Sequence, residues 1–139
     1  MKVIEIILEF SSDYWSDCGI DFSMEFLHEF SHSDWAKLQK ECCSVLTSVE
    51  WKIRCAEALG DIEPEESLNI LMLLLRSESE ELVFSALDSI NSSWHIARLD
   101  DNLIDELLCF IDTLPVSGVI PDIVVKSLVS KLVSSRTSK

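Results

Sequence analysis

Glycine and proline are scarce in this chain, which has three of each among 139 residues. Their scarcity excludes collagen-like repeats and flexible linker sequences, because both are rich in these residues. Hydrophobic residues make up 47% of the chain, which is enough apolar surface for a packed core without disulfides or metals. We therefore expect residues 1–139 to form a single folded domain that requires no cofactor.

Positive charge is scarce as well. Eleven Lys and Arg residues stand against 25 Asp and Glu residues, and the net charge at pH 7 is −14. Proteins that bind nucleic acids or anionic membranes use clusters of Lys and Arg, and here the only such cluster is Lys126, Lys131, Arg136 and Lys139 near the C-terminal end. We therefore expect neither a nucleic acid nor a membrane as partner, and the negative charge favours a basic protein instead.

Long apolar runs and paired cysteines are also lacking. The longest apolar run, residues 70–75, is far too short to cross a bilayer, and the first ten residues lack the uninterrupted apolar stretch of a signal peptide. The five cysteines are an odd number without a Cys-x-x-Cys pair, so they predict neither a disulfide framework nor a zinc ribbon. We expect free, mostly buried thiols and a reducing cytoplasm as the compartment.

Helical periodicity dominates from residue 20 onward, whereas residues 3–10 fit a helix and a strand equally well. The expected helices carry these apolar stripes: Ile20/Met24/Leu27, Trp35/Leu38/Cys42/Val45, Leu68/Leu71/Met72/Leu75, Leu82/Val83/Ala86/Leu87/Ile90, Leu103/Leu107/Leu108/Ile111 and Ile123/Val124/Leu128/Leu132. Trp35 and Trp51 have apolar neighbours at helical spacing and are predicted core residues, while Trp15, beside polar residues, fits core and surface equally.

Polar residues and glycine mark where these helices begin and end. We expect Gly60 to end a helix over 51–59 and Pro64 to occupy the first position of the next one. Three N-caps are predicted: Ser33, Thr47 in a capping box with Glu50, and Ser77 in a capping box with Glu80.

An internal repeat sets the predicted architecture. A shift of 28 positions lays Cys55, Ala58, Leu59 and Ile62 over Val83, Ala86, Leu87 and Ile90, so two helices present the same stripe to the same kind of neighbour. Together with the acidic Pro turn and the Leu-rich helix between them, residues 48–92 resemble HEAT-like repeats. The fold we predict is all-α, with stacked antiparallel helical hairpins and about seven to eight helices. Residues 1–31 would cap one end, and residues 33–134 would form about three pairs.

One string matches a catalytic motif. His28-Glu29-Phe30-Ser31-His32 fits the H-E-x-x-H pattern of zinc peptidases, in which two histidines on one helix bind the metal and the glutamate activates water. The motif requires a continuous helix, but serines 31 and 33 mark a helix boundary. We therefore favour two partly exposed histidines at a helix end, with no metal ligand and no catalytic residue. A zinc-dependent hydrolase remains the remote alternative. The sequence contains no glycine-rich phosphate-binding loop, and we expect no small-molecule substrate.

Acidic residues are unevenly distributed. Residues 1–31 hold seven against one lysine, residues 61–112 hold thirteen against two arginines, and residues 32–60 hold four of each sign. In stacked helical pairs the second helices line one surface, which is the usual binding face. The partner-binding residues predicted on that face are Glu57, Asp61, Glu81, Ser85, Asp88 and Trp94.

Trp51-x-x-Arg54 followed by Ala58-Leu59-Gly60-Asp61 resembles the corresponding helix of HEAT-like immunity proteins from bacterial contact-dependent inhibition and polymorphic-toxin systems. This resemblance implies a non-enzymatic cytoplasmic protein that neutralises a cognate toxin domain, often a basic nuclease, by covering its active site. The acidic surface would then imitate the nucleic-acid backbone. The main alternative is a general HEAT-like scaffold or adaptor that binds several partners.

Overall fold

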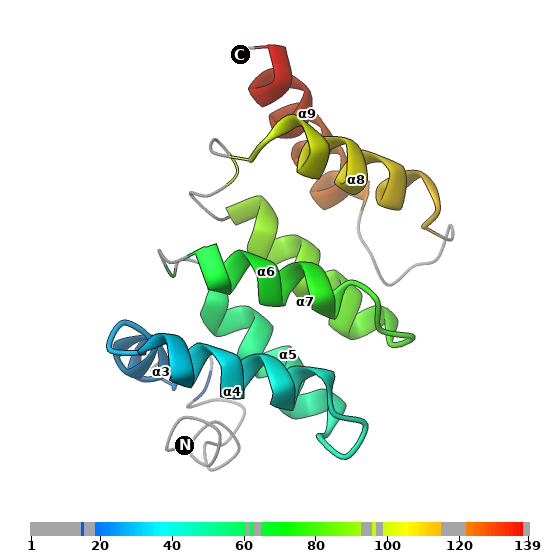
Figure 1. Ribbon diagram of the computed structural model, residues 1–139. Helices are drawn as coiled ribbons and strands as arrows, with labels where there is room; N and C mark the ends of the chain where they lie inside the picture. The colour runs from blue at the N-terminus through cyan, green and yellow to red at the C-terminus, as the bar shows by residue number, and fades with distance from the viewer. Residues whose placement is uncertain are drawn as a thin grey trace.

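The computed structural model describes residues 15, 19–60, 62, 65–92, 96, 99–114 and 122–137. Within these ranges the chain forms helices and no strand, which confirms the predicted all-α class. The helices in Figure 1 are α3 (Ile20–Leu27), α4 (His32–Cys43), α5 (Val49–Leu59), α6 (Glu65–Leu74), α7 (Glu80–Ser92), α8 (Asp101–Asp112) and α9 (Asp122–Thr137). None of these helices has the length and apolar character needed to span a membrane. Residues 3–10 and Pro64 lie outside the described residues.

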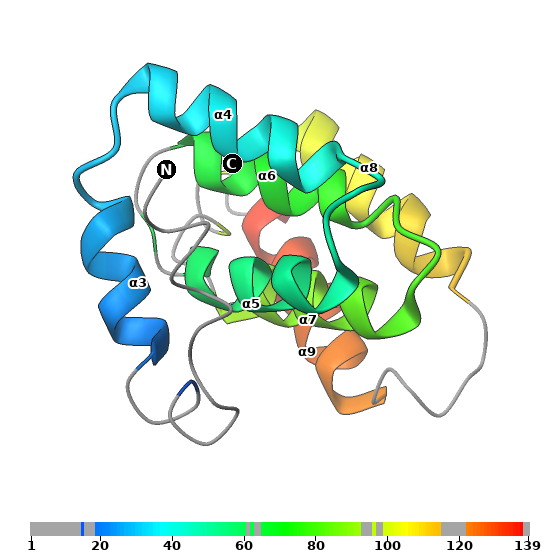
Figure 2. The same cartoon turned by 90° about the horizontal axis from the view of Figure 1, so that it is seen from below.

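The helices form two layers, which lie one above the other in Figure 2. Helices α4, α6 and α8 make one layer, and α5, α7 and α9 make the other. Within the second layer α5 packs against α7 and α7 against α9, while α3 covers the outer side of α5. Successive helices α4/α5, α6/α7 and α8/α9 therefore form hairpins that stack side by side, as the repeated stripe predicted.

The contact between α5 and α7 is the centre of the core. All eight residues of the repeated stripe are buried, from Cys55 to Ile62 on one side and from Val83 to Ile90 on the other. Burying a Leu or Ile side chain contributes about 1.5–3 kcal/mol. Because the same pattern appears in both helices, each presents a matching apolar surface to the other.

Gly60 lies at the contact between α5 and α7. A Cβ atom at this position would lie 3.4 Å from the Cβ of Ser89 on α7. The Ser89 hydroxyl donates a hydrogen bond of 2.6 Å to the carbonyl of Ala56, which joins the helices by a polar contact inside an apolar junction. Gly60 ends α5 as predicted, but its φ of −57° is ordinary right-handed helix, so the position does not require the conformational freedom of glycine, and a methyl group would make ordinary contact there.

The three tryptophans that the structure describes occupy the core. Trp35 and Trp51 are 4% and 1% exposed, which confirms their prediction as core residues. Trp15 is also buried, at 4% exposed, so the structure settles the open alternative in favour of the core. Trp35 further makes an edge-to-face contact with Phe30, with ring centroids 5.1 Å apart. This contact ties the connection between α3 and α4 to the core.

The three predicted N-caps were each misplaced by one or two residues. The cap of α4 is Ser31, which forms a capping box with Asp34, and not Ser33. The caps at the start of α5 and α7 are Ser48 and Ser79, whose hydroxyl groups accept from the amides of Trp51 and Leu82. In each case two residues with hydroxyl groups lie within three positions of each other, and the sequence pattern predicted the wrong one of the two as the cap. The displaced residues bond elsewhere: Thr47 donates to Glu41, and Ser77 accepts from the Ser79 amide.

Two residues assigned to apolar stripes are exposed. Val45 is 95% exposed because α4 ends at Cys43 and the chain then turns towards α5. Ile123 is 76% exposed because it lies in the first turn of α9, whereas Leu128 and Leu132 further along are buried as expected.

The prediction of mostly buried cysteines overestimated their burial. Of the four cysteines that the structure describes, two are buried and two are exposed, although all four are free thiols.

Candidate partner-binding surface

The second-helix layer carries the predicted binding residues that the structure describes. Glu57 on α5 and Glu81 and Asp88 on α7 are exposed, and Ser85 on α7 is half-buried. We call these four residues the acidic face. Asp61 and Trp94, which were predicted to extend it, lie outside the described residues.

The spacing along α7 explains why its members share one side. Glu81, Ser85 and Asp88 are four and three positions apart, so they line up along about 10 Å of helix surface. The opposite side of α7 carries the buried stripe that packs on α5. Glu57 joins these residues from the neighbouring helix, and its carboxylate is close enough to Asp88 for the two charges to interact.

The environment of Glu57 disfavours its negative charge. Partial burial raises the pKa of its carboxyl group above the ordinary value of 4.5, and the negative charge of Asp88 raises it further. A hydrogen bond with Trp15 and the positive charge of Arg54 act in the opposite direction without cancelling this effect. The folded protein therefore keeps the Glu57 carboxylate at a cost that comes mainly from burial and in smaller part from the charge of Asp88, and a cation placed beside the two carboxylates would relieve the repulsion.

Arg54 forms a buried positive centre beside the acidic face. It is 6% exposed, and its guanidinium carbon lies 5.2 Å from the centre of the Trp15 ring, a cation–π geometry. One guanidinium nitrogen lies 3.6 Å from a carboxylate oxygen of Glu50, one helical turn earlier. The carboxylates of Glu50 and Glu57 thus flank an arginine that is covered by the Trp15 indole ring, and this contact joins Trp15 to α5.

Sequence reasoning missed this cluster, although part of its signal was visible. Glu50, Arg54 and Glu57 are spaced by four and three positions, which places them on one side of a helix. Arg54 also lies directly beside Cys55 of the buried stripe, so it borders the core. Nothing in the sequence indicated that Trp15, 39 positions away, would cover it.

The His-Glu-x-x-His string is divided between two helices. His28 is the C-cap of α3, and His32 is the first residue of α4. The His32 side chain is 96% exposed, and its Nδ1 lies 3.2 Å from a carboxylate oxygen of Glu66 on α6. The two imidazoles therefore do not share one helix face as the zinc motif requires. No group of three or more His, Cys, Asp or Glu side chains in the described part of the chain is arranged to hold a metal ion.

Comparison of this chain with protein-family models, with curated proteins and with solved structures found no match.

Proposed function

We propose that this protein binds a basic protein through the acidic face, and that it is an immunity protein which neutralises a cognate toxin domain in the cytoplasm. The toxin we expect is a nuclease whose active site normally receives the phosphate backbone. Carboxylates on α5 and α7 would occupy that site and exclude the nucleic acid. No catalytic step by the immunity protein is required.

The proximity of Glu57 and Asp88 is the observation that carries this proposal. Burial is the main cause of the raised pKa of Glu57 and the nearby charge of Asp88 adds to it, so the Glu57 charge destabilises the free protein slightly. A Lys or Arg side chain of a partner would remove the repulsion and gain two charge-assisted contacts. Sites that bind a partner often retain such unfavourable local charge, because the partner supplies the compensation.

The residues of the family resemblance support the fold more than the binding. Trp51, Arg54, Ala58 and Leu59 are all buried. Their pattern therefore describes how α5 packs, and an immunity protein and a scaffold built on the same hairpins would share it. The charge of the acidic face is what favours a basic toxin over a general adaptor role.

Co-expression tests the biological role. We expect a C-terminal toxin domain to be encoded immediately upstream of this gene, and the test produces that domain in cells with and without the present protein. We expect growth to stop when the domain is produced alone and to recover when both proteins are present. Growth arrest that persists in the presence of the protein would contradict the immunity role.

Charge reversal tests the surface. The triple variant Glu57→Lys, Glu81→Lys, Asp88→Lys changes the net charge by the same amount as a control triple on the other layer, Glu65→Lys, Glu106→Lys, Asp112→Lys. We expect the first variant to weaken toxin binding at least a hundredfold and the control to change it only a few-fold, because interactions between close charge pairs exceed the effect of net charge. Equal losses in the two variants would rule out the acidic face as the binding surface.

Salt dependence and partner number separate an immunity protein from a scaffold. An electrostatic complex associates quickly at low salt and more slowly as ionic strength rises, because the screening length falls to about 8 Å at physiological salt. We expect one tight, salt-sensitive partner. Several weak partners whose affinities do not change with ionic strength would favour the adaptor role.

A further inference from the structure

Two buried cysteines face each other across the first hairpin. The sulfur atoms of Cys42 on α4 and Cys55 on α5 are 3.7 Å apart, and the two residues are 4% and 1% exposed. A disulfide bond requires sulfur atoms about 2.05 Å apart. The sulfurs are already in van der Waals contact and must approach further to form a bond.

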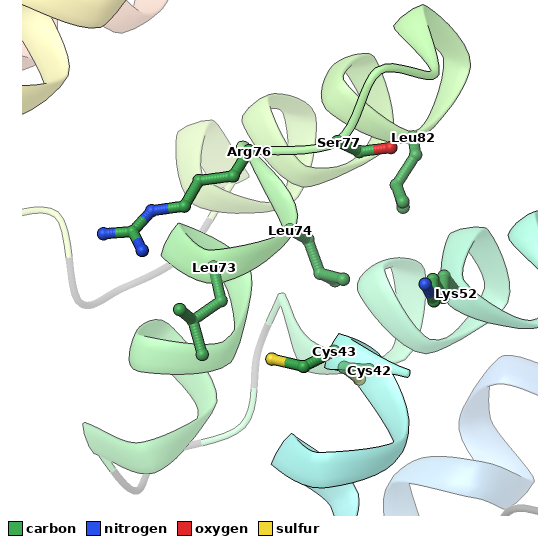
Figure 3. Close-up of a pocket in the computed structure, with 8 residues that line it drawn as sticks. All are labelled: Cys42, Cys43, Lys52, Leu73, Leu74, Arg76, Ser77 and Leu82. Carbon is green, nitrogen blue, oxygen red and sulfur yellow. The ribbon is translucent and has the colours of Figure 1, made fainter. Parts of the chain in front are cut away.

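A surface pocket leads to this pair. A cavity of about 270 Å³ is lined by Cys42 and the exposed Cys43, together with residues from α5, α6 and the start of α7. Figure 3 shows the two neighbouring cysteines at the end of α4, with the side chain of Cys43 pointing towards the side of Leu73 and Cys42 on the side nearer Lys52. A small reagent in this pocket therefore meets Cys42, while Cys55 lies behind it in the core.

We propose that Cys42 and Cys55 are a modification site at which a peroxide produces a reversible disulfide that locks α4 to α5. The sulfur of Cys42 attacks one peroxide oxygen, the O–O bond breaks, and Cys42 becomes a sulfenic acid with release of one water. The sulfur of Cys55 then attacks the Cys42 sulfur, forms the S–S bond and displaces hydroxide, which leaves as a second water after taking the thiol proton. Two thiols are oxidised by two electrons, and one peroxide is reduced to two waters.

The surroundings assign the order of these steps. The hydrogen bond with Cys42 is the largest cause that raises the pKa of the Cys55 thiol, and burial adds to it. Cys55 is thus a poor first target, because the thiolate is the reactive form. Cys42 lines the pocket and meets the oxidant, and Cys55 is held beside it as the resolving thiol. Cys43, adjacent in sequence, has no second sulfur at a comparable distance among the described residues.

Peptide mapping of the Cys43→Ser protein tests the pairing. Trypsin cuts after Lys40, Lys52, Arg54 and Arg76, so Cys42 and Cys55 fall in separate peptides, 41–52 and 55–76. Replacing the exposed Cys43 leaves Cys42 as the single cysteine of its peptide. After treatment of the folded protein with hydrogen peroxide, we expect the two peptides joined with the loss of two hydrogen atoms, and separated again by dithiothreitol. Added oxygen on peptide 41–52 without this cross-link would overturn the proposal.

Two further variants serve as controls. Cys42→Ser must abolish the cross-link even though Cys43 remains, whereas Cys109→Ser, which removes another exposed thiol, must leave it intact. A cross-link that survives Cys42→Ser would assign the chemistry to Cys43 and refute the pairing. The disulfide closes a loop of about 14 residues, so we expect oxidation of the Cys43→Ser protein to raise its unfolding temperature by about 10 °C. An unchanged or lowered unfolding temperature would contradict the lock.

Discussion

The substitution Glu57→Gln should have opposite effects on stability and on binding. The amide keeps the shape of the side chain but removes the charge that Asp88 repels and that partial burial disfavours. Because the pKa of Glu57 is raised in the folded state, the folded protein binds more protons than the unfolded chain at pH values between the two pKa values. The free energy of unfolding therefore falls as pH rises through that window. Glutamine has no proton to lose there, so the variant does not suffer this loss of stability.

The expected gain is small because Glu57 is exposed and water screens its charge. We expect Glu57→Gln to raise the free energy of unfolding at pH 7 by about 0.5 kcal/mol. The gain should disappear below about pH 4, where the carboxyl group is protonated in both states. Binding of a basic partner should weaken at the same time by about tenfold, since one charge-assisted contact is lost.

Urea denaturation at pH 7 and at pH 3.5, followed by tryptophan fluorescence, measures the first effect. Titration with the partner measures the second. Combining the variant with Asp88→Asn supplies the control, because the two stability gains should be less than additive if they remove the same repulsion. A loss of stability at pH 7, or strictly additive gains, would refute the electrostatic account of this pair.

Five further substitutions, at four positions, test the packing and the helix ends. Gly60→Ala should be neutral or stabilise by about 0.5 kcal/mol, because φ is ordinary and the new Cβ makes normal contact, whereas Gly60→Leu should separate α5 from α7 and lower the unfolding temperature markedly. Leu87→Ala should cost about 2–5 kcal/mol in denaturant unfolding, while Val45→Ser, at a position 95% exposed, should stay within about 0.5 kcal/mol of the wild type. Ser31→Ala should cost about 1 kcal/mol and raise the pKa of Asp34, which hydrogen bonds to Ser31 hold below its ordinary value; an unshifted Asp34 resonance in an NMR titration would contradict the capping box.

The fold was predictable because the spacing of hydrophobic residues determines which face of each helix is buried. The repeat between Cys55–Ile62 and Val83–Ile90 correctly indicated two helices packed through matching stripes, and Gly60 correctly marked the end of one of them. Helix starts were less predictable, since a cap depends on which of two nearby hydroxyl groups reaches an unbonded amide. That choice depends on the direction of the incoming chain, which is a tertiary property.

The candidate site was only partly predictable. Helical spacing correctly placed Glu81 and Asp88 on one exposed side of α7. It did not show that Glu57 would interact with Asp88, nor that Trp15 would cover Arg54, because these contacts join residues far apart in the sequence. The Cys42–Cys55 contact likewise depends on how two helices of a hairpin face each other, which the apolar pattern leaves open.

The close junction of α5 and α7 has a consequence for how the acidic face behaves over time. Stacked helical pairs open most easily at their ends, where each helix has a neighbour on one side only. Helices α5 and α7 have neighbours on both sides, α3 and α9 included, so their amides should be among the last to exchange with deuterated solvent. The backbone positions that carry these carboxylates are thus fixed before any partner arrives, and a complex formed through them loses little backbone conformational entropy.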